Sequence, residues 1–283
     1  MGNVDHMTNT QLCQRWRNGA HSWRHTHDGG FNAARYDVAP IDDDDTARRF
    51  VQAHHYSRSY PAARLRYGLY DGAALVGVMV LGIPMQAKVV TGAFPTLTPY
   101  AESLELSRLV LLDEVPANGE SWFVSRGYAD AAEQGVRGVV SFSDPQPRHV
   151  DGRLVMPGHV GTVYQALGAT YTGRGTARTL TMLPDGSVLS DRSAQKVRAG
   201  EKGARAVVAQ LVAMGAPELC AGQDPAGWLA DALNAVGARK VRHGGNHRYV
   251  FRIGRTRGER SRVTVAMPSL AYPKRADELA LAA

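Results

Sequence analysis

Blocks of hydrophobic and polar positions along the chain predict alternating helices and strands. Four acids at 42–45 precede the segment TARRFVQAHHY, and a helix is expected there because acids favour the positive end of the helix dipole. Two strand-like runs within 64–84 flank Asp71-Gly72, a common hairpin turn, and predict a β-hairpin. The next predicted elements are a strand at 104–115, a helix at 118–135 and a strand at 137–144.

The second half of the chain predicts a similar mixture. Its predicted elements are a short helix at 161–169, a hairpin at 171–190 with a Pro-Asp-Gly turn, basic helical sequence at 191–216, a helix at 225–237 and a strand at 247–254. Elements in this order predict an α+β fold with one mixed central β-sheet flanked by helices. The order is similar to that of the GCN5-related N-acetyltransferase (GNAT) core, so we expect a GNAT-like sheet.

Length and composition limit the classes of protein to consider. The 283 residues are 44% hydrophobic, which is ordinary for a globular protein, and the two cysteines make neither a metal motif nor a disulfide framework. The start of the chain is polar, and the longest apolar run, at 73–85, is too short for a membrane span. We therefore expect a soluble cytoplasmic protein.

Charge is distributed unevenly along the chain. Residues 171–283 contain 18 Lys and Arg against 9 Asp and Glu, whereas residues 1–170 contain 15 against 17. This asymmetry indicates a polyanionic partner such as nucleic acid, although a solvated basic surface gives the same counts. The expected parts are a weakly ordered leader at 1–34, one domain at 35–255 with a basic C-terminal half, and a tail at 256–283.

The loop after the 104–115 strand is a candidate cofactor site. The first turn of a helix offers backbone N–H groups that bind phosphate, so the pyrophosphate of an acyl-CoA fits at this helix start. The candidate residues are Asn118, Gly119, Glu120, Ser121 and Trp122. However, Glu120 repels phosphate and the loop has little glycine, so an ordinary turn capped by Asn118 is the alternative.

Polar residues also gather after the strand that ends at Asp144. Ligands bind at such strand ends in open α/β sheets. Gly158 and Gly161 allow close approach of the backbone to a ligand, and His159 and Tyr164 lie in the same segment. An Asp, a His and a Tyr that converge can hold an amine, remove its proton or ligate a metal. A loop with a satisfied Asp and a core Tyr is the structural alternative.

Five segments occur together in the order of a known family, namely HHYSRSYP, LELSRLVLLDEVPANGESWFVSR, SFSDP, GHVGTVYQALGATYTG and NHRYVFRIG. Over roughly residues 50–254 the chain resembles the Mom family of phage DNA-modification proteins, whose fold is GNAT-like. The resemblance implies a phage or prophage transferase in the host cytoplasm. Its activity would convert the exocyclic amine of adenine in double-stranded DNA to a carbamoylmethyl-amine, which protects the DNA from restriction. A homodimer is compatible with the resemblance.

The resemblance also implies roles for particular residues. Together with His159 from the glycine-rich segment, the implied catalytic residues are Asp144, Tyr164, His55, Tyr56, Ser107 and Arg108. Residues 118–122 match the place where a GNAT relative holds acetyl-CoA or another acyl-CoA, and iron is associated with a His that matches His55. The segment Pro145–Pro157 is longer than in the family and is expected to be a surface loop.

The basic half of the chain supplies candidate DNA contacts. A target adenine must leave the base stack, which costs roughly a few kcal/mol of free energy. Contacts between basic residues and DNA phosphates can offset this cost. The candidates are Arg174, Arg178, Arg192, Lys196, Arg198, Lys202, His247, Arg248, Arg255 and Arg257. Two other functions stay open: an acyl-CoA-dependent N-acetyltransferase acting on a small amine or a hypermodified base, and a non-catalytic DNA-binding protein.

Overall fold

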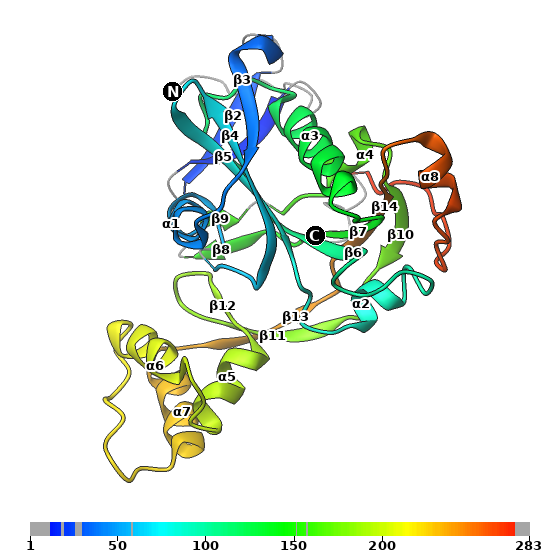
Figure 1. Cartoon of the computed structure of the whole chain (residues 1–283). Coiled ribbons are helices and arrows are strands. Elements are labelled where there is room, and N and C mark those ends of the chain that lie inside the picture. The colour runs from blue at the N-terminus through cyan, green and yellow to red at the C-terminus, as the bar shows by residue number, and fades with distance from the viewer. Residues whose placement is uncertain are drawn as a thin grey trace. The chain divides into compact units, whose positions relative to one another are not determined.

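The computed structural model describes residues 12–17, 20–25, 30–57, 59–150, 152–156 and 158–274, with the backbone alone at 12–25 and 153–155. Contacts divide the chain into two compact units (Figure 1). The first, which we call the sheet unit, comprises Met1–Pro145, Pro157–Arg174 and Asn246–Ala283. The second, the inserted unit, comprises Gln146–Met156 and Gly175–Gly245. One domain was expected over 35–255, and no shift of composition marks the inserted unit.

A seven-stranded mixed sheet forms the centre of the sheet unit, in the order β10-β14-β7-β6-β5-β4-β3. Among these strands β6 and β7 are parallel and every other neighbouring pair is antiparallel. The predicted mixed α+β fold is therefore confirmed. The strands are β3 (Tyr36–Pro40), β4 (Ala63–Asp71), β5 (Ala74–Gly82), β6 (Ser103–Leu111), β7 (Gly138–Ser143), β10 (Thr170–Arg174) and β14 (His247–Arg252).

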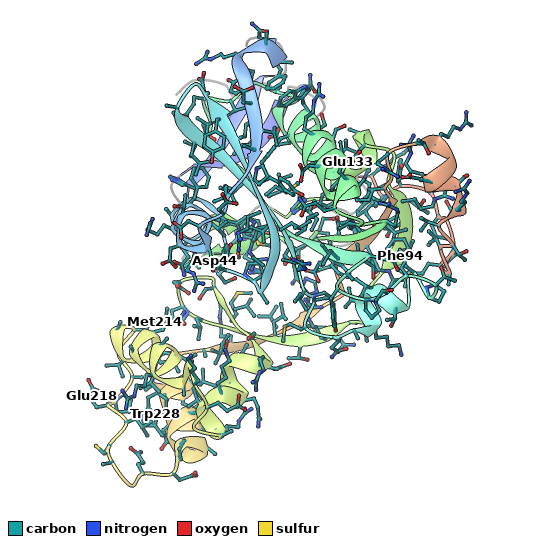
Figure 2. The ribbon with its side chains drawn as sticks, in the orientation of Figure 1. Asp44, Phe94, Glu133, Met214, Glu218 and Trp228 are labelled. Carbon is teal, nitrogen blue, oxygen red and sulfur yellow. The ribbon has the colours of Figure 1, made fainter. Side chains whose placement is uncertain are left out.

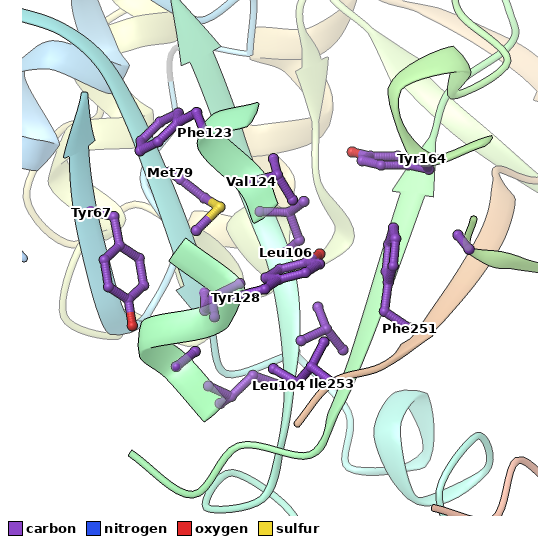
Figure 3. Close-up of a cluster of buried hydrophobic side chains, with 14 of the residues drawn as sticks. Tyr67, Met79, Leu104, Leu106, Phe123, Val124, Tyr128, Tyr164, Phe251 and Ile253 are labelled. Atoms are coloured by element: carbon purple, nitrogen blue, oxygen red, sulfur yellow. The ribbon is translucent and has the colours of Figure 1, made fainter. Parts of the chain in front are cut away.

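Helices cover both faces of this sheet because alternate strand residues are apolar on both faces. On one face α3 (Gly119–Glu133) packs Phe123 and Val124 into a core with Leu104 and Leu106 (Figure 3). On the other face α1 (Asp44–His54) packs Val51 with residues of β5 and β6. The shorter helices are α2 (Lys88–Thr91), α4 (Thr162–Ala166) and α8 (Arg257–Arg262).

The acidic run at 42–45 starts a helix, as the sequence predicts. Asp43 caps α1 by accepting bonds from the backbone N–H groups of Asp45 and Thr46. Asp44 fixes the helix to the sheet, since its carboxylate accepts from Arg66 Nη1 at 3.0 Å and from Tyr60 Oη at 3.0 Å (Figure 2). The hairpin around Asp71-Gly72 is also confirmed as β4 and β5.

The segment 171–190 does not form the single hairpin that was expected. β10 pairs with β14 in the main sheet, where the ring of Tyr171 lies 5.2 Å from that of Tyr249. β11 (Arg178–Met182) and β12 (Val188–Leu189) instead pair across the Pro-Asp-Gly turn inside the inserted unit. Burial of Tyr171 against β14 explains why this strand joins the larger sheet.

The inserted unit has its own core. Its helices α5 (Asp191–Arg198), α6 (Ala204–Ala213) and α7 (Pro225–Ala235) surround Trp228, whose Nε1 donates to Pro217 O at 3.0 Å (Figure 2). The helical sequence at 191–216 divides at Gly200 and Gly203, which both have positive φ. The remaining strands are β8 (Arg148–Val150), β9 (Arg153–Met156) and β13 (Arg239–His243).

The two ends of the chain differ from the predicted leader and tail. The described part of the C-terminal segment packs on the sheet unit: Val263 is buried, and Leu270 N donates to Tyr171 O at 2.9 Å. At the other end β1 (Leu12–Arg17) pairs with β2 (Ala20–His25), and the rest of the expected leader before residue 30 lies outside the described residues. No helix within the described ranges is long and apolar enough to cross a membrane.

Candidate functional site

The candidate site lies where the parallel strands β6 and β7 part. Their pairing ends at Leu106 opposite Ser141. Beyond that point β6 pairs with β5 and β7 pairs with β14. Side chains at the ends of both strands can therefore meet in the opening, and several predicted catalytic residues lie around it.

A β-bulge at Ser107 arranges the β6 side of this opening. The β5–β6 register pairs Leu81 with Leu106 but Val80 with Arg108, so Ser107 is an extra residue. In a regular strand, residues three apart point to opposite faces. The extra residue brings Arg108 to the face of Glu105. Gly82 makes room for the bulge, because a Cβ there would lie 2.7 Å from Ser107 Oγ.

Arg108, on β6, donates hydrogen bonds to the segment that follows α1. Its Nε donates to Ser59 O at 2.8 Å and its Nη2 donates to Ser59 Oγ at 2.7 Å. This two-pronged contact holds the segment that carries His55 and Tyr56 against the opening. Burial lowers the pKa of the Arg108 guanidinium, while Tyr56 and Glu105 raise it.

His55 is held as a neutral ring in one tautomer. The Ser57 backbone N–H donates to His55 Nδ1 at 3.1 Å, so the neutral ring carries its proton on Nε2. Burial lowers the pKa of His55 well below its usual value, and the positive charges of Arg108 and His159 lower it further. The ring lies against that of Tyr56, with centroids 4.2 Å apart and planes tilted by 30°. Nε2 is thus a hydrogen-bond donor at neutral pH.

Tyr164 supplies a buried phenol from the α4 side. Its ring lies 5.4 Å from Tyr249 and meets Phe251 edge-on at 6.1 Å (Figure 3). Burial raises the pKa of Tyr164, and the negative groups of Tyr56 and Glu105 raise it further, so the hydroxyl keeps its proton at neutral pH. The same phenol senses the charge of Arg108, which lowers its pKa.

Glu105 is a site residue that the motif analysis missed. Burial raises the pKa of its carboxyl, whereas Arg108 and a hydrogen bond from Ser107 lower it. Ser107 Oγ lies 3.4 Å from Glu105 Oε1. An acid between Leu104 and Leu106 in the middle of an apolar strand is the signal that would have identified it.

Asp144 directly follows the last residue of β7. Asp144 is buried, with 9% of its surface exposed, and its carbonyl accepts from His159 N at 2.8 Å. This bond joins two residues that flank the 145–157 insertion. Gln146–Met156 belongs to the inserted unit, where β8 and β9 form a hairpin rather than an irregular loop.

Gly161 is required by its conformation and by its neighbours. Its φ is +76°, and a Cβ there would lie 2.8 Å from Tyr249 Cε2 and 2.9 Å from Tyr164 Cδ2. Any side chain at this position would displace the Tyr164 ring. The glycine-rich segment is thus explained by close packing of the backbone against two tyrosines.

The predicted cofactor residues form the start of α3. Asn118 has a φ of +75° and its side chain makes no cap bond, so the alternative of an ordinary turn capped by the Asn118 side chain is wrong. Gly119 is buried, and a Cβ there would lie 2.6 Å from Val115 Cγ1. Trp122 packs 5.3 Å from Phe31, and Glu120 lies in the first turn as expected. Ser121 Oγ donates to Asn118 O at 3.1 Å.

The surroundings of His55 do not fit an iron ion. Within the described ranges no three His, Cys, Asp or Glu residues come together as a metal-binding group. His55 Nδ1 already accepts from Ser57, and the positive charge of Arg108 acts on the ring. This donor set disfavours a cation beside His55.

The predicted DNA contacts are divided between the two units, and four of them, His247, Arg248, Arg192 and Arg255, make side-chain contacts within the protein. His247 is buried at 1% exposure with Nδ1 2.8 Å from Tyr171 Oη, a position that does not offer the ring to a phosphate. Arg248 Nε donates to Thr172 Oγ1 at 2.8 Å. Arg192 Nη1 donates to Glu201 Oε1 at 3.0 Å. Arg255 Nε donates to Glu259 Oε1 at 3.1 Å. The predicted contacts that are exposed to solvent are Arg174, Arg178, Arg192, Arg198, Lys202, Arg255 and Arg257, while Lys196 is half-buried.

The mixed sheet, its parallel β6–β7 pair and the helix that follows β6 define an α+β protein of GNAT-like architecture. The model of the Mom protein family matches residues 35–274, and the chain belongs to this family. The expected family is thereby confirmed, and the match extends over most of the predicted tail. No curated protein matches the chain.

Solved structures with a similar fold are acetyltransferases of low sequence identity. A tandem GNAT protein from the clavulanic acid biosynthesis pathway is 10% identical with a TM-score of 0.33, over 71% of this chain and 65% of that chain. The GNAT family N-acetyltransferase YhbS from Escherichia coli, in complex with CoA, is 14% identical with a TM-score of 0.32, over 51% and 72%. The chain thus spans less than two thirds of the first of these proteins.

Proposed function

We propose that this protein transfers a carbamoylmethyl group to the exocyclic amine of adenine in DNA. Membership of the Mom protein family supports the reaction class. The observation that carries the proposal is the bulge at Ser107, which brings Glu105 and Arg108 to one face of β6. The electrostatic coupling of Tyr164 to both of these residues supports a single site for the three side chains.

The transfer forms one bond, breaks one bond and releases one proton. The amine nitrogen attacks the methylene carbon of an electrophilic carbamoylmethyl donor, and the leaving group departs with the bonding electron pair. Glu105 accepts the proton from the amine, because burial raises the pKa of its carboxyl and so makes it a stronger base. Tyr164 donates a hydrogen bond to the leaving group, since its raised pKa keeps the phenol protonated.

The segment after α1 orients the substrate in this proposal. Tyr56 has 37% of its surface exposed and its ring lies 4.2 Å from that of His55, so its exposed part is suited to stack on a base that has left the duplex. His55 Nε2–H donates to a ring nitrogen or to the donor carbonyl. Arg108 carries positive charge beside these groups and stabilises negative charge that develops on the leaving group.

Nucleoside mass spectrometry tests the proposal directly. Plasmid DNA from bacteria that express the wild-type protein should contain a deoxyadenosine with a carbamoylmethyl mass increase. Glu105→Gln should abolish this product, and Glu114→Gln, the same change at an exposed position just beyond β6, should not. Absence of any modified nucleoside with soluble, folded wild-type protein would refute the proposal.

A second candidate function is acyl-CoA-dependent acetylation of a small amine. In the chain, β6 is followed by the first turn of α3, whose backbone N–H groups suit the pyrophosphate of an acyl-CoA. The opening between β6 and β7 would then suit its thioester. Turnover of acetyl-CoA with small amines in the absence of DNA would favour this function. Turnover that requires DNA would favour adenine modification.

A further inference from the structure

The positive charge of the inserted unit is concentrated outside its helices. From Asp191 to Ala235, five Lys and Arg residues accompany five Asp and Glu residues, so the helical part has no net charge. Four of the DNA contacts expected from the sequence lie in this neutral part, and Arg192 is paired with Glu201 there. The excess of basic residues in the inserted unit therefore lies outside residues 191–235.

Two antiparallel strands of this unit carry the excess. β11 has the sequence RTLTM and β13 has the sequence RKVRH, and neither contains an acid. Their register pairs Thr179 with Arg242 and Thr181 with Lys240. We call β11 and β13 together the basic ribbon. Its four Lys and Arg residues are Arg178, Arg239, Lys240 and Arg242.

The cations of the basic ribbon point to solvent. All four are exposed, and so is Thr179 beside Arg242. Lys240 Nζ donates to Thr181 Oγ1 at 2.7 Å, which orients the amine on the surface of the ribbon. Among the described ion pairs, none involves Arg178, Arg239 or Arg242.

Lys240 and Arg242 lie on one face of β13, about 7 Å apart at the usual rise of a strand. The short strand β12 pairs with β11 at Thr181 and Met182 only, so over the rest of its length the basic ribbon is two-stranded. A two-stranded antiparallel ribbon fits the major groove of B-DNA, which is about 12 Å wide. Ribbon proteins that bind DNA contact phosphates and base edges with alternate residues of such strands. Arginine, lysine and threonine are suited to both kinds of contact.

We infer that the basic ribbon is a double-stranded DNA-binding surface, and that it contributes more to DNA affinity than the basic residues of α5 and α6. The inference deepens the proposed function, because it names the surface by which the DNA substrate is held. It needs no catalytic group of the sheet unit, so it can be tested without a donor molecule.

The test compares two double variants of the full chain that each remove two positive charges from the inserted unit. Lys240→Gln with Arg242→Gln changes the basic ribbon and keeps a hydrogen-bonding group near Thr181. Arg198→Gln with Lys202→Gln is the matched control, since both residues are exposed on the helical part. Binding to a fluorescein-labelled DNA duplex is measured by anisotropy over a range of salt concentrations.

The ribbon variant should bind about 30-fold more weakly at 0.15 M salt, with the slope of log K against log salt reduced by about 2, as expected for two lost phosphate contacts. The control should stay close to wild type. Equal losses in both variants, or no loss in the ribbon variant, would overturn the inference. If the ribbon double variant melts early, Arg178→Gln alone should reduce the slope by about 1.

The outcomes separate this inference from the proposed function. If wild-type protein binds DNA through the ribbon but produces no modified nucleoside, the proposed function is wrong and the ribbon surface stands. If wild-type protein modifies adenine while the ribbon variant binds DNA as tightly as wild type, the ribbon inference is wrong and the function stands.

Discussion

Glu105 and Arg108 lie on the same face of β6, because the bulge at Ser107 adds one residue between them. Without the bulge the carboxyl and the guanidinium would be on opposite faces of the sheet. The Arg108 side chain donates to Ser59, so the same bulge also determines where the segment with His55 is held. One local irregularity thus couples two parts of the site that are distant in sequence.

Replacement of Glu105 by Gln should reduce modification about 10²- to 10⁴-fold, the usual contribution of a general base. The wild-type rate should rise with pH through the raised pKa of Glu105 and then level off, because the carboxylate is the active form. Initial rates of adenine modification across a pH series check both points. A wild-type profile without this rise would contradict the role.

The same variant makes a prediction about stability. Folding raises the pKa of Glu105, so the folded protein favours the protonated carboxyl. The contribution of this group to the free energy of unfolding is therefore present at low pH and is lost as pH rises through the raised pKa. Gln stays neutral and avoids this loss. Glu105→Gln should therefore unfold at a higher temperature than wild type at neutral pH, with the two curves converging in acid. Thermal unfolding followed by circular dichroism measures the difference.

Tyr164→Phe should remove activity and leave the fold intact. The variant keeps the ring contacts with Tyr249 and Phe251 and loses only the hydroxyl. Tyr249→Phe provides the contrast, since that hydroxyl donates to Val160 O and accepts from Gln165 Nε2 at 3.1 Å. Tyr249→Phe should lose about 1 kcal/mol of stability. Equal activities for Tyr164→Phe and wild type would rule out the proposed role of the phenol.

Arg108→Gln should raise the pKa of His55. Burial is the first cause of the low pKa of this ring, and the charge of Arg108 is the second, so the variant removes the second cause only. Titration of the His55 ring protons by NMR should show a shift upward that still stops short of the usual value. Arg198→Gln, in the inserted unit, serves as the control and should leave this titration unchanged.

Gly161→Ala should destabilise the protein more than Gly168→Ala. Both glycines have positive φ, +76° and +71°, so both substitutions incur the backbone strain of about 1–2 kcal/mol. A Cβ at Gly161 also meets the rings of Tyr249 and Tyr164, whereas no atom lies within 4 Å of one at Gly168. The free energy of unfolding of each variant is measured with denaturant, and the difference between the two losses gives the cost of the steric contacts at Gly161. Equal losses would show that Tyr164 can move without penalty.

Local signals were sufficient for most elements of the sheet unit. The acids at 42–45 predicted the start of α1 because an N-terminal carboxylate satisfies free N–H groups of the helix itself. Asp71-Gly72 predicted the β4–β5 hairpin because a tight turn and its two strands are neighbours in sequence. The place of Asp144 at the end of β7 followed from the same kind of pattern.

The tertiary structure decided what depends on partners distant in sequence. Periodicity predicted a strand at β10 but not that β14 would be its partner. The family resemblance pointed to Ser107 and Arg108 but not to the bulge that turns Arg108 toward Glu105, because a bulge is defined by the register of the neighbouring strand.

The sequence by itself determined most elements of the sheet unit, the family resemblance and the overall basic charge of the second half of the chain. It did not determine that the excess charge of the inserted unit lies on β11 and β13, because the acids that neutralise the helical part are spread along the chain. Strand pairing and burial, which join residues far apart in sequence, decided which charged groups face one another and which face solvent.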